Sequence, residues 1–496
     1  MNVRNDSFEV EKDIGVIKER SRRGALLTFG TQVPTFLISF ASQIILAHLL
    51  SPGQFGVAAM AAPVIGFAAI FNDLGFQQAT IQKPKIVHAE VSLLFWVNTG
   101  VSASLAVLLV LLSPVIAWMY GEPQVGPVVR ALAGVLFVGS LSAQSYALLN
   151  RRMQFTSLAI IDVAGAVAGV ATGIGFAWLG AGYWALVLQS LATNVVMVSL
   201  IWNRAKWRPS LPRWDRDILP MIRFGQHMTT FKIVSYFSTY FANIMIGIIN
   251  GPAALGVFER AFKLVLQPIG QITAPINRIA VPMLSRVAGS DSHYRNAYIR
   301  MLQIILLVSM PGLLCASVMS HQVVLGLLGP AWLATAPILQ CLSIVGIFSL
   351  YSNSTFWLFV SQNRVREQMT CGFVSSGLVM VSLLTGVHWG PTGIATSYAL
   401  FAPLVHGVFV WRVTRKGPVS RRDIVTASYP IVTAAITAAI ALHFAEPYFP
   451  AGTLLDLATG GVMSYAVTAL VLLCFPGGRR LLGGLRGLAI RRPAIS

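Results

Sequence analysis

Charged residues are scarce in this chain of 496 residues: they make up 11% of the sequence, whereas 55% of the residues are hydrophobic. This excludes an ordinary soluble domain, in which about a quarter of the residues are charged. Acidic residues are the scarcer kind, with 17 Asp and Glu against 36 Lys and Arg. The net charge of +19 could indicate nucleic-acid binding, but the alternation of cations with hydrophobic runs favours membrane topology as its cause, and no nucleic-acid partner is expected.

Several kinds of catalytic and ligand-binding chemistry have no signal in the sequence. The four cysteines, Cys315, Cys341, Cys371 and Cys474, lack metal-type spacing and form no expected disulfide framework. A P-loop of the form G-x-x-x-x-G-K-[ST] is absent, which excludes ATP hydrolysis by that route. The predicted external loops, of about 5 to 12 residues, are too short for a folded catalytic domain. We therefore expect no metal and no cofactor, and a protein that is not an enzyme.

Long hydrophobic runs dominate what is present. About fourteen runs have the length of roughly 20 residues that a helix needs to cross a bilayer. They begin near Gly24, Gly53, Val91, Gly126, Thr156, Tyr183, Gly225, Ala254, Ala297, Ala331, Glu367, Thr392, Ile424 and Thr453. The sequence therefore predicts an all-α integral membrane protein with about fourteen transmembrane helices.

The Lys and Arg residues concentrate in the two tails and in every second gap between these runs. Examples are Arg151 and Arg152, the stretch 204–223 and the stretch 412–422, while the gaps near Gly251 and Pro447 hold no cation. Basic loops mark the cytoplasmic side of a membrane protein. We therefore expect both termini to be cytoplasmic.

An internal repeat divides the chain into two halves. FASQIILAHLLSPGQFGV at 40–57 aligns without a gap with YFANIMIGIINGPAALGV at 240–257, and Pro52/Pro252 and Gly56/Gly256 are among the identical pairs. Because six runs separate the copies, both start on the same membrane side, which predicts parallel repeats related by a pseudo-two-fold axis. The expected plan is a cytoplasmic tail (1–23), a six-helix lobe (24–203), a cytoplasmic linker (204–223), a second six-helix lobe (224–416), two additional helices (417–476) and a basic cytoplasmic tail (477–496).

Five cations fall inside predicted spans, where charge is costly and usually functional. Four of them belong to polar stripes at helical spacing, which are formed by Lys232, Tyr236, Thr239 and Asn243 and by Arg260, Lys263, Gln267, Gln271, Ala274 and Arg278. A stripe of this kind should face a protein interior or a wet cavity, where its cations would bind an anion such as phosphate or pyrophosphate. Alternatively, Arg260 or Lys263 pairs with Glu259, and Arg278 extends to the membrane surface. Arg130, the fifth cation, is expected at the interface.

Carboxylates inside the predicted spans are few. Asp73 and Asp162 would lie toward the cytoplasmic half of their helices. Either could bind a coupling proton or sodium ion, or simply pair with a nearby cation.

Three stretches resemble the polysaccharide-export branch of the multidrug/oligosaccharidyl-lipid/polysaccharide flippase superfamily, the Wzx-like flippases. They are LLSPGQFGVAAMAAPVIGFAAIFNDLGFQQATIQ from Leu49, ERAFKLVLQPIGQITAPINRIAVPMLSR from Glu259 and GPAWLATAPILQCLSIVGIFSLYSNSTFWLFVSQNR from Gly329. The similarity extends to about Lys416, and the order of the motifs is its specific feature.

The resemblance implies two six-helix lobes around a central cavity, alternating access, and a bacterial inner-membrane location. Its implied cargo is a polyprenyl-pyrophosphate-linked oligosaccharide for exopolysaccharide or lipopolysaccharide biosynthesis, with cavity cations holding the pyrophosphate. By position this matches Lys232, Arg260, Lys263 and Arg278, and we expect Tyr236, Asn243, Gln267 and Gln271 to hydrogen-bond the sugar or head group. Membrane lipids, a glycan polymerase and export machinery are further expected partners.

Two other functions stay open at this point. A cation-coupled multidrug exporter of the same superfamily would require a more acidic cavity than the one this sequence predicts. A membrane-embedded glycan polymerase or ligase would want catalytic residues in a substantial external loop.

Overall fold

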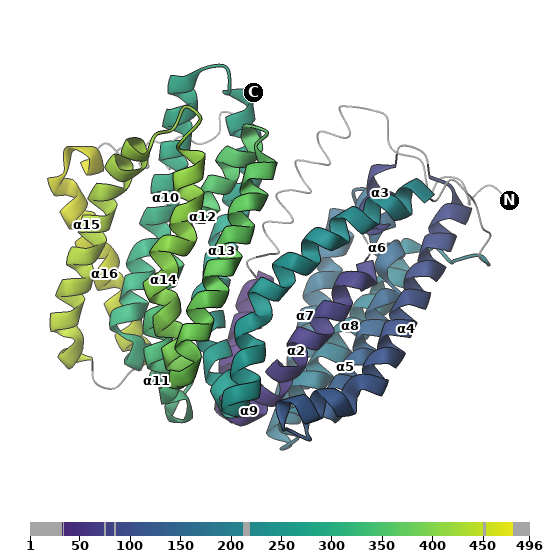
Figure 1. Ribbon diagram of the computed structural model, residues 1–496. Coiled ribbons are helices and arrows are strands. Elements are labelled where there is room, and N and C mark those ends of the chain that lie inside the picture. Colours follow the sequence, from purple (N-terminus) through teal and green to yellow (C-terminus); the bar gives the residue numbers. More distant parts are fainter. Residues whose placement is uncertain are drawn as a thin grey trace. The chain divides into compact units, whose positions relative to one another are not determined.

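The computed structural model describes residues 32, 34–73, 76–83, 86–211, 219–449 and 453–479, and of residues 72, 73, 82, 219–235 and 237–239 it describes the backbone alone. These parts of the chain are helices and short connections, with no strand among them (Figure 1). The helices are 34–49, α2 (Pro52–Asp73), α3 (Phe76–Gln82), α4 (His88–Tyr120), α5 (Val125–Ser140), α6 (Ala143–Arg151), α7 (Phe155–Trp178), α8 (Trp184–Ala205), α9 (Leu219–Arg286), α10 (Asp291–Val318), α11 (Ser320–Leu327), α12 (Ala336–Ser361), α13 (Val365–Gly386), α14 (Gly390–Val413), α15 (Arg421–Ala445) and α16 (Leu454–Cys474), with short 3-10 turns at Pro330–Thr335, Val387–Trp389 and Glu446–Tyr448.

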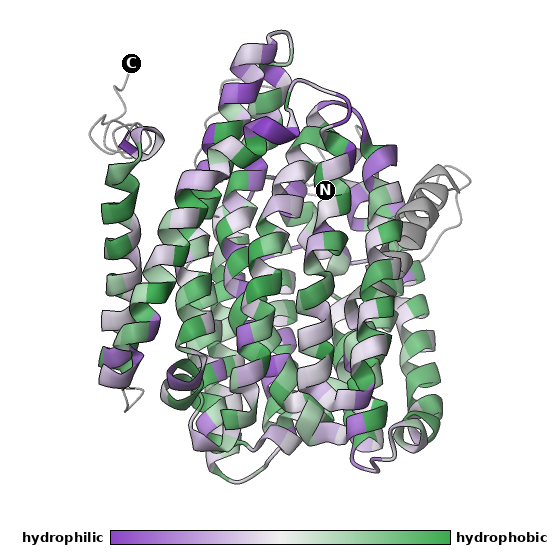
Figure 2. Ribbon diagram, turned by 60° about the vertical axis from the view of Figure 1, so that its left-hand side comes forward, coloured by the Kyte–Doolittle hydropathy of each residue, from purple (hydrophilic) through white to green (hydrophobic). Residues whose placement is uncertain are grey.

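Eleven stretches of the described chain are long and apolar enough to cross a membrane as helices. Two of them, Tyr240–Arg286 and Val365–Val413, each contain parts of two predicted runs, and part of the first run forms the shorter apolar helix Pro34–Leu49. The helices are hydrophobic along much of their length, and hydrophilic residues are more frequent near their ends (Figure 2). The prediction of an all-α membrane protein with about fourteen spans is confirmed.

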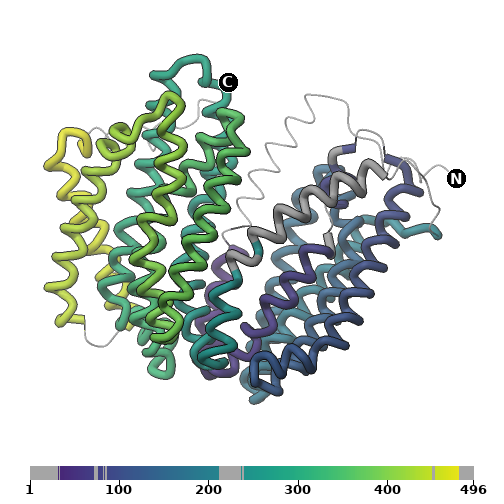
Figure 3. Tube along the Cα trace, in the orientation of Figure 1, coloured from purple at the N-terminus to yellow at the C-terminus, as the bar shows by residue number. Residues whose placement is uncertain are grey.

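The chain packs as two compact units, residues 1–256 (unit 1) and 257–496 (unit 2). The long helix α9 passes from one to the other and has a non-helical residue at Gly251, with φ 80° and ψ −177°, where the chain turns sharply (Figure 3). Glycine adopts this conformation without the strain that a Cβ would add. The linker predicted at 204–223 separates the two sequence repeats, whereas the two compact units are defined by contacts within the folded chain. The boundary between the two six-helix lobes therefore stays a prediction.

In unit 1, small residues let α7 and α8 pack closely. Gly165, Gly169 and Gly173 recur every fourth residue on α7, and a Cβ on Gly169 or Gly173 would collide with Thr193 or Gln189 of α8. Such small-residue stripes are how membrane helices approach each other, because burial from water gives no driving force in lipid.

The two copies of the sequence repeat meet within unit 1. A Cβ added to Gly56 would overlap the carbonyl oxygen of Pro252, and a Cβ added to Gly256 would overlap the carbonyl oxygen of Pro52. The two Pro-x-x-x-Gly turns therefore pack reciprocally, each glycine against the proline of the other copy. Reciprocity of this kind is what a two-fold axis produces. It puts Pro52 and Pro252 on the same side of the membrane, as parallel repeats require.

In unit 2, α15 and α16 lie beside α10 (Figure 1). The Ser464 hydroxyl of α16 donates to the Pro311 carbonyl at 3.0 Å, and the Tyr465 hydroxyl donates to the Val308 carbonyl at 2.5 Å. Side-chain hydrogen bonds of this kind satisfy polar groups that lipid cannot. They attach α16 to α10 of unit 2.

Candidate functional site

Arg260 is the most deeply buried cation of the predicted stripe. Its residue is 5% exposed, and its guanidinium lies 5.8 Å from the ring centroid of Trp332. A cation over an indole face gains electrostatic attraction that partly offsets the loss of water. No sequence signal predicted this contact, since Trp332 is far along the chain and belongs to the 3-10 turn before α12.

Lys263 and Glu259 form an ion pair one turn apart on the same helix. The Lys263 Nζ lies 3.0 Å from the Glu259 Oε1, with the lysine side chain 45% exposed and the glutamate 17% exposed. This is one of the two alternatives left open by the sequence. Glu259 therefore lies beside two cations of the same helix, its neighbour Arg260 and its ion-pair partner Lys263.

The stripe becomes more accessible toward the end of α9. Gln267 is half-buried, whereas Gln271 and Arg278 are exposed. One polar side chain on another face of the helix was missed: the Asn277 Oδ1 accepts a hydrogen bond of 2.5 Å from the buried Trp357 indole, which holds α9 on α12.

The residues predicted on the first part of α9 lie in unit 1. The Tyr236 hydroxyl donates to the Pro63 carbonyl of α2 at 2.5 Å, and its ring stacks on Tyr240 with centroids 4.4 Å apart. Asn243 is buried, at 6% exposure. The side chain of Lys232 lies outside the described residues. Binding of substrate by Lys232, Tyr236 and Asn243 therefore stays a prediction.

Asp162 lines a cavity of about 330 Å³ within unit 1. Tyr146, Ser140, Ser142 and Gln77 line the same cavity. A carboxylate among hydroxyl and amide oxygens is the kind of environment in which a small cation or a proton binds. The side chain of Asp73, the other predicted coupling residue, lies outside the described residues. Among the described residues, no group of three or more His, Cys, Asp or Glu side chains could hold a metal ion.

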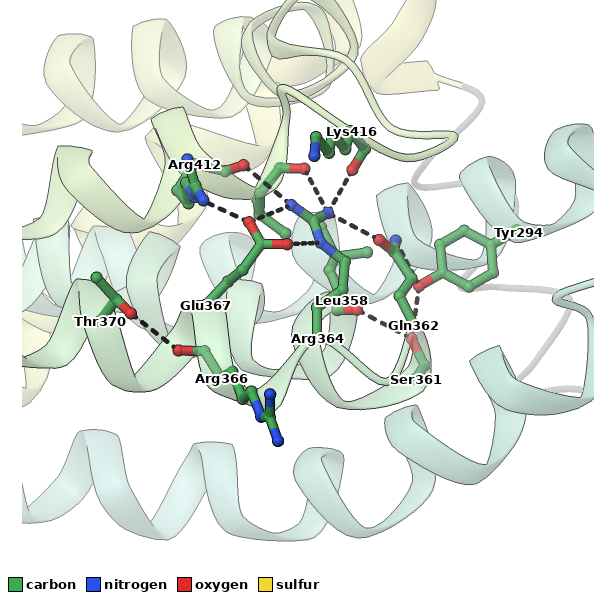
Figure 4. A network of polar contacts seen from close by, with 11 residues as sticks. Tyr294, Leu358, Ser361, Gln362, Arg364, Arg366, Glu367, Thr370, Arg412 and Lys416 are labelled. Carbon is green, nitrogen blue, oxygen red and sulfur yellow. Dashed lines mark hydrogen bonds and ion pairs between the residues drawn. The ribbon is translucent and has the colours of Figure 1, made fainter. Parts of the chain in front are cut away.

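A second charged cluster joins α13 to the end of α14 in unit 2 (Figure 4). Arg364 binds both oxygens of Glu367, at 2.9 and 3.1 Å, and also donates to the carbonyls of Arg412, Val413 and Lys416. The last carbonyls of a helix lack intrahelical donors, and an arginine there satisfies them and complements the helix dipole. Arg151, near the end of α6, has the same role as Arg364 at another helix end: it donates hydrogen bonds to the carbonyls of Thr80 and Lys83 around the end of α3.

We expect Arg364→Ala to destabilise the protein, because it removes two donors from Glu367 and leaves several helix-end carbonyls without their donor. The Arg364 side chain is 13% exposed, so the free energy of unfolding should fall by about 2 to 3 kcal/mol. A thermal-unfolding measurement in detergent would detect this as a lower melting temperature. Arg366→Ala, at an exposed position in the first turn of α13, is the matched control and should change stability by less than about 0.5 kcal/mol. Equal melting temperatures for the two variants would contradict the structural role of Arg364.

Known proteins of similar sequence and fold include polysaccharide biosynthesis proteins and membrane transporters. A family model described as polysaccharide biosynthesis protein matches residues 45–337. The chain is 23% identical over 391 residues to the lipopolysaccharide biosynthesis protein WzxC of Escherichia coli (strain K12), covering 77% of this chain and 79% of that protein. It is 22% identical over 457 residues to the succinoglycan biosynthesis transport protein ExoT of Rhizobium meliloti (strain 1021), covering 88% and 90%. Its fold is similar to that of the lipid II flippase MurJ in an inward closed conformation, with a TM-score of 0.70 at 12% identity, covering 89% of this chain and 98% of the other.

Proposed function

This chain belongs to the family of polysaccharide biosynthesis proteins, and from that premise we propose that it is a flippase for a lipid-linked oligosaccharide. The cargo would be a polyprenyl-pyrophosphate-linked repeat unit, moved from the cytoplasmic to the periplasmic leaflet of a bacterial inner membrane for exopolysaccharide or lipopolysaccharide assembly. The similarity to a transport protein of succinoglycan biosynthesis and the fold shared with a lipid II flippase support this. Transport of this kind needs no covalent chemistry by the protein.

The observation that carries the proposal is the cationic stripe on α9. Arg260 is buried inside a membrane-spanning helix, one turn from Lys263, which pairs with Glu259. Cations inside a membrane-spanning helix are costly and usually mark a binding site or pathway. Pyrophosphate suits this site, since an arginine offers forked donors and a lysine offers a point charge to phosphate oxygens.

In the proposed mechanism the head group enters a central cavity while the lipid tail stays in the bilayer. Arg260, Lys263, Arg278 and Lys232 would hold the pyrophosphate. Hydrogen bonds to the sugar would come from Tyr236, Asn243, Gln267 and Gln271. Movement of the two parallel repeats would expose the cavity to one side of the membrane and then to the other.

We further propose that Asp162 is the coupling residue. Its cavity in unit 1 offers hydroxyl and amide oxygens beside the carboxylate, and a bound proton or sodium ion could bias the movement of the repeats. The basic loops support an orientation with both termini in the cytoplasm. A glycan polymerase and export machinery would act on the delivered repeat unit.

Reconstitution tests the proposed function directly. The purified protein in liposomes should carry a polyprenyl-pyrophosphate-linked glycan between leaflets, so that a membrane-impermeant glycosidase cleaves more than the half that faces outward. Protein-free liposomes are the control for spontaneous flipping, and a cationic dye tests the drug-exporter alternative. Transport of the dye without movement of the glycan would overturn the proposal in favour of that alternative.

A further inference from the structure

An open apolar groove lies on the surface of unit 2 between α13 and α14. Its volume is about 460 Å³, and its lining includes Val374 of α13 and Pro403, Leu404 and Gly407 of α14. Val374 and Leu404 are 49% and 59% exposed. A Cβ on Gly407 would meet no atom within 4 Å, so the missing side chain leaves open space. The groove is thus shaped and lined for a hydrocarbon chain rather than for a polar ligand.

A basic cluster stands at the end of this groove. Arg412 lines the groove and uses its Nε to bind the Glu367 Oε2 at 2.8 Å. Trp411 also lines the groove, and the guanidinium of Arg415 stacks on it, 3.8 Å from the ring centroid. Figure 4 shows how Arg412 approaches Glu367 from the side opposite Arg364.

The charges of this cluster do not balance. Both oxygens of Glu367 are already bound by Arg364, so this carboxylate neutralises at most one of three nearby arginines. Among the described residues, the terminal amino groups of Arg412 have no hydrogen-bond partner, and its side chain is 40% exposed. Paired N–H donors on an accessible arginine match the oxygens of a phosphate.

We propose that this groove binds an anionic phospholipid of the leaflet that the basic loops face. One acyl chain would lie along Val374, Leu404 and Gly407, and the phosphate would accept hydrogen bonds from Arg412 and Arg415. The site is separate from the stripe on α9 and shares no residue with it. A soluble phosphate would gain nothing from the apolar groove, and a zwitterionic lipid would bring its own cation to the arginines, so an anionic lipid fits both parts of the site.

Native mass spectrometry of the full-length protein with equal amounts of phosphatidylglycerol and phosphatidylcholine tests this. We expect the first bound lipid to be phosphatidylglycerol, with a preference of about tenfold, the size of one charge-assisted contact. Arg412→Gln combined with Arg415→Gln should abolish the preference. Gly407→Leu should reduce binding of both lipids at this site, because the new side chain fills the groove.

Arg422→Gln is the matched control. Arg422 is an exposed cation at the start of α15, in the same basic segment but outside the groove, and its loss should leave the preference unchanged. An equal loss of preference in Arg422→Gln would show that diffuse attraction to the basic loops suffices and would overturn the proposal. Displacement of the lipid by millimolar glycerol phosphate would overturn it too, because the head group alone would then account for binding. If the double arginine variant fails to fold, Gly407→Leu and Arg422→Gln still decide the outcome.

Discussion

Arg260→Ala should abolish glycan translocation in the liposome assay while the protein remains folded in the membrane. Losing one charge-assisted contact to a desolvated phosphate costs about 2 kcal/mol or more, which lowers binding roughly 30-fold. Arg260→Lys should recover part of the rate, since it keeps the charge but loses the forked geometry. Arg130→Ala removes an exposed cation of another span and should translocate at the normal rate.

A double variant separates substrate binding from a structural role of Arg260. Were Arg260 present only to neutralise Glu259, then Glu259→Gln together with Arg260→Ala would remove both charges and restore translocation. If Arg260 binds the pyrophosphate, the double variant should stay inactive, whereas Glu259→Gln alone should bind substrate at least as tightly as the wild type because a repulsive charge is gone. Translocation rates and melting temperatures measured side by side distinguish the two cases. A fully active double variant would rule out Arg260 as a substrate ligand.

Helix positions could be predicted from the sequence because the membrane imposes one rule on every span: about 20 apolar residues that satisfy their own backbone hydrogen bonds. The same rule could not predict how α13 is tied to α14. That link depends on hydrogen bonds from Arg364 to the carbonyls of Arg412 and Val413. Because every residue has a main-chain carbonyl, the sequence does not show which ones a side chain will bind.

The polar stripe was predictable as a helical face but not in its contacts. The Lys263–Glu259 pair follows from i,i+4 spacing, and the sequence offered it as an alternative. The position of Arg260 over Trp332 depends on tertiary packing between distant segments, which periodicity cannot reveal. The groove beside Arg412 was missed for a related reason. Gly407 contributes to it by having no side chain, and a hydropathy pattern does not show where volume is missing.

Mutations at the contact between the two repeat turns should reduce transport as strongly as mutations in the cationic stripe. At Gly56 and Gly256 the neighbouring atoms are main-chain carbonyls of Pro252 and Pro52, so no side-chain rotation can make room for a Cβ. Adding one carbon to a packed core lowers stability by about 1 to 3 kcal/mol even where side chains can adjust. Here the neighbouring atoms are main-chain atoms, which adjust less easily. We therefore expect Gly56→Ala and Gly256→Ala each to reduce translocation at least about tenfold, because the paired turns can no longer reach this contact.

Gly53→Ala provides the control within the same turn. A Cβ on Gly53 would meet no atom within 4 Å, and the matching position of the second repeat is already Ala253. This variant should translocate glycan and unfold like the wild type. If the contact forms in only one state of the transport cycle, Gly56→Ala should lose transport but keep a near-normal melting temperature. If every state needs the contact, the transport rate and the melting temperature should both fall. Normal transport in both Gly56→Ala and Gly256→Ala would show that the reciprocal contact is dispensable. The contact between the two repeat turns would then have no role in transport.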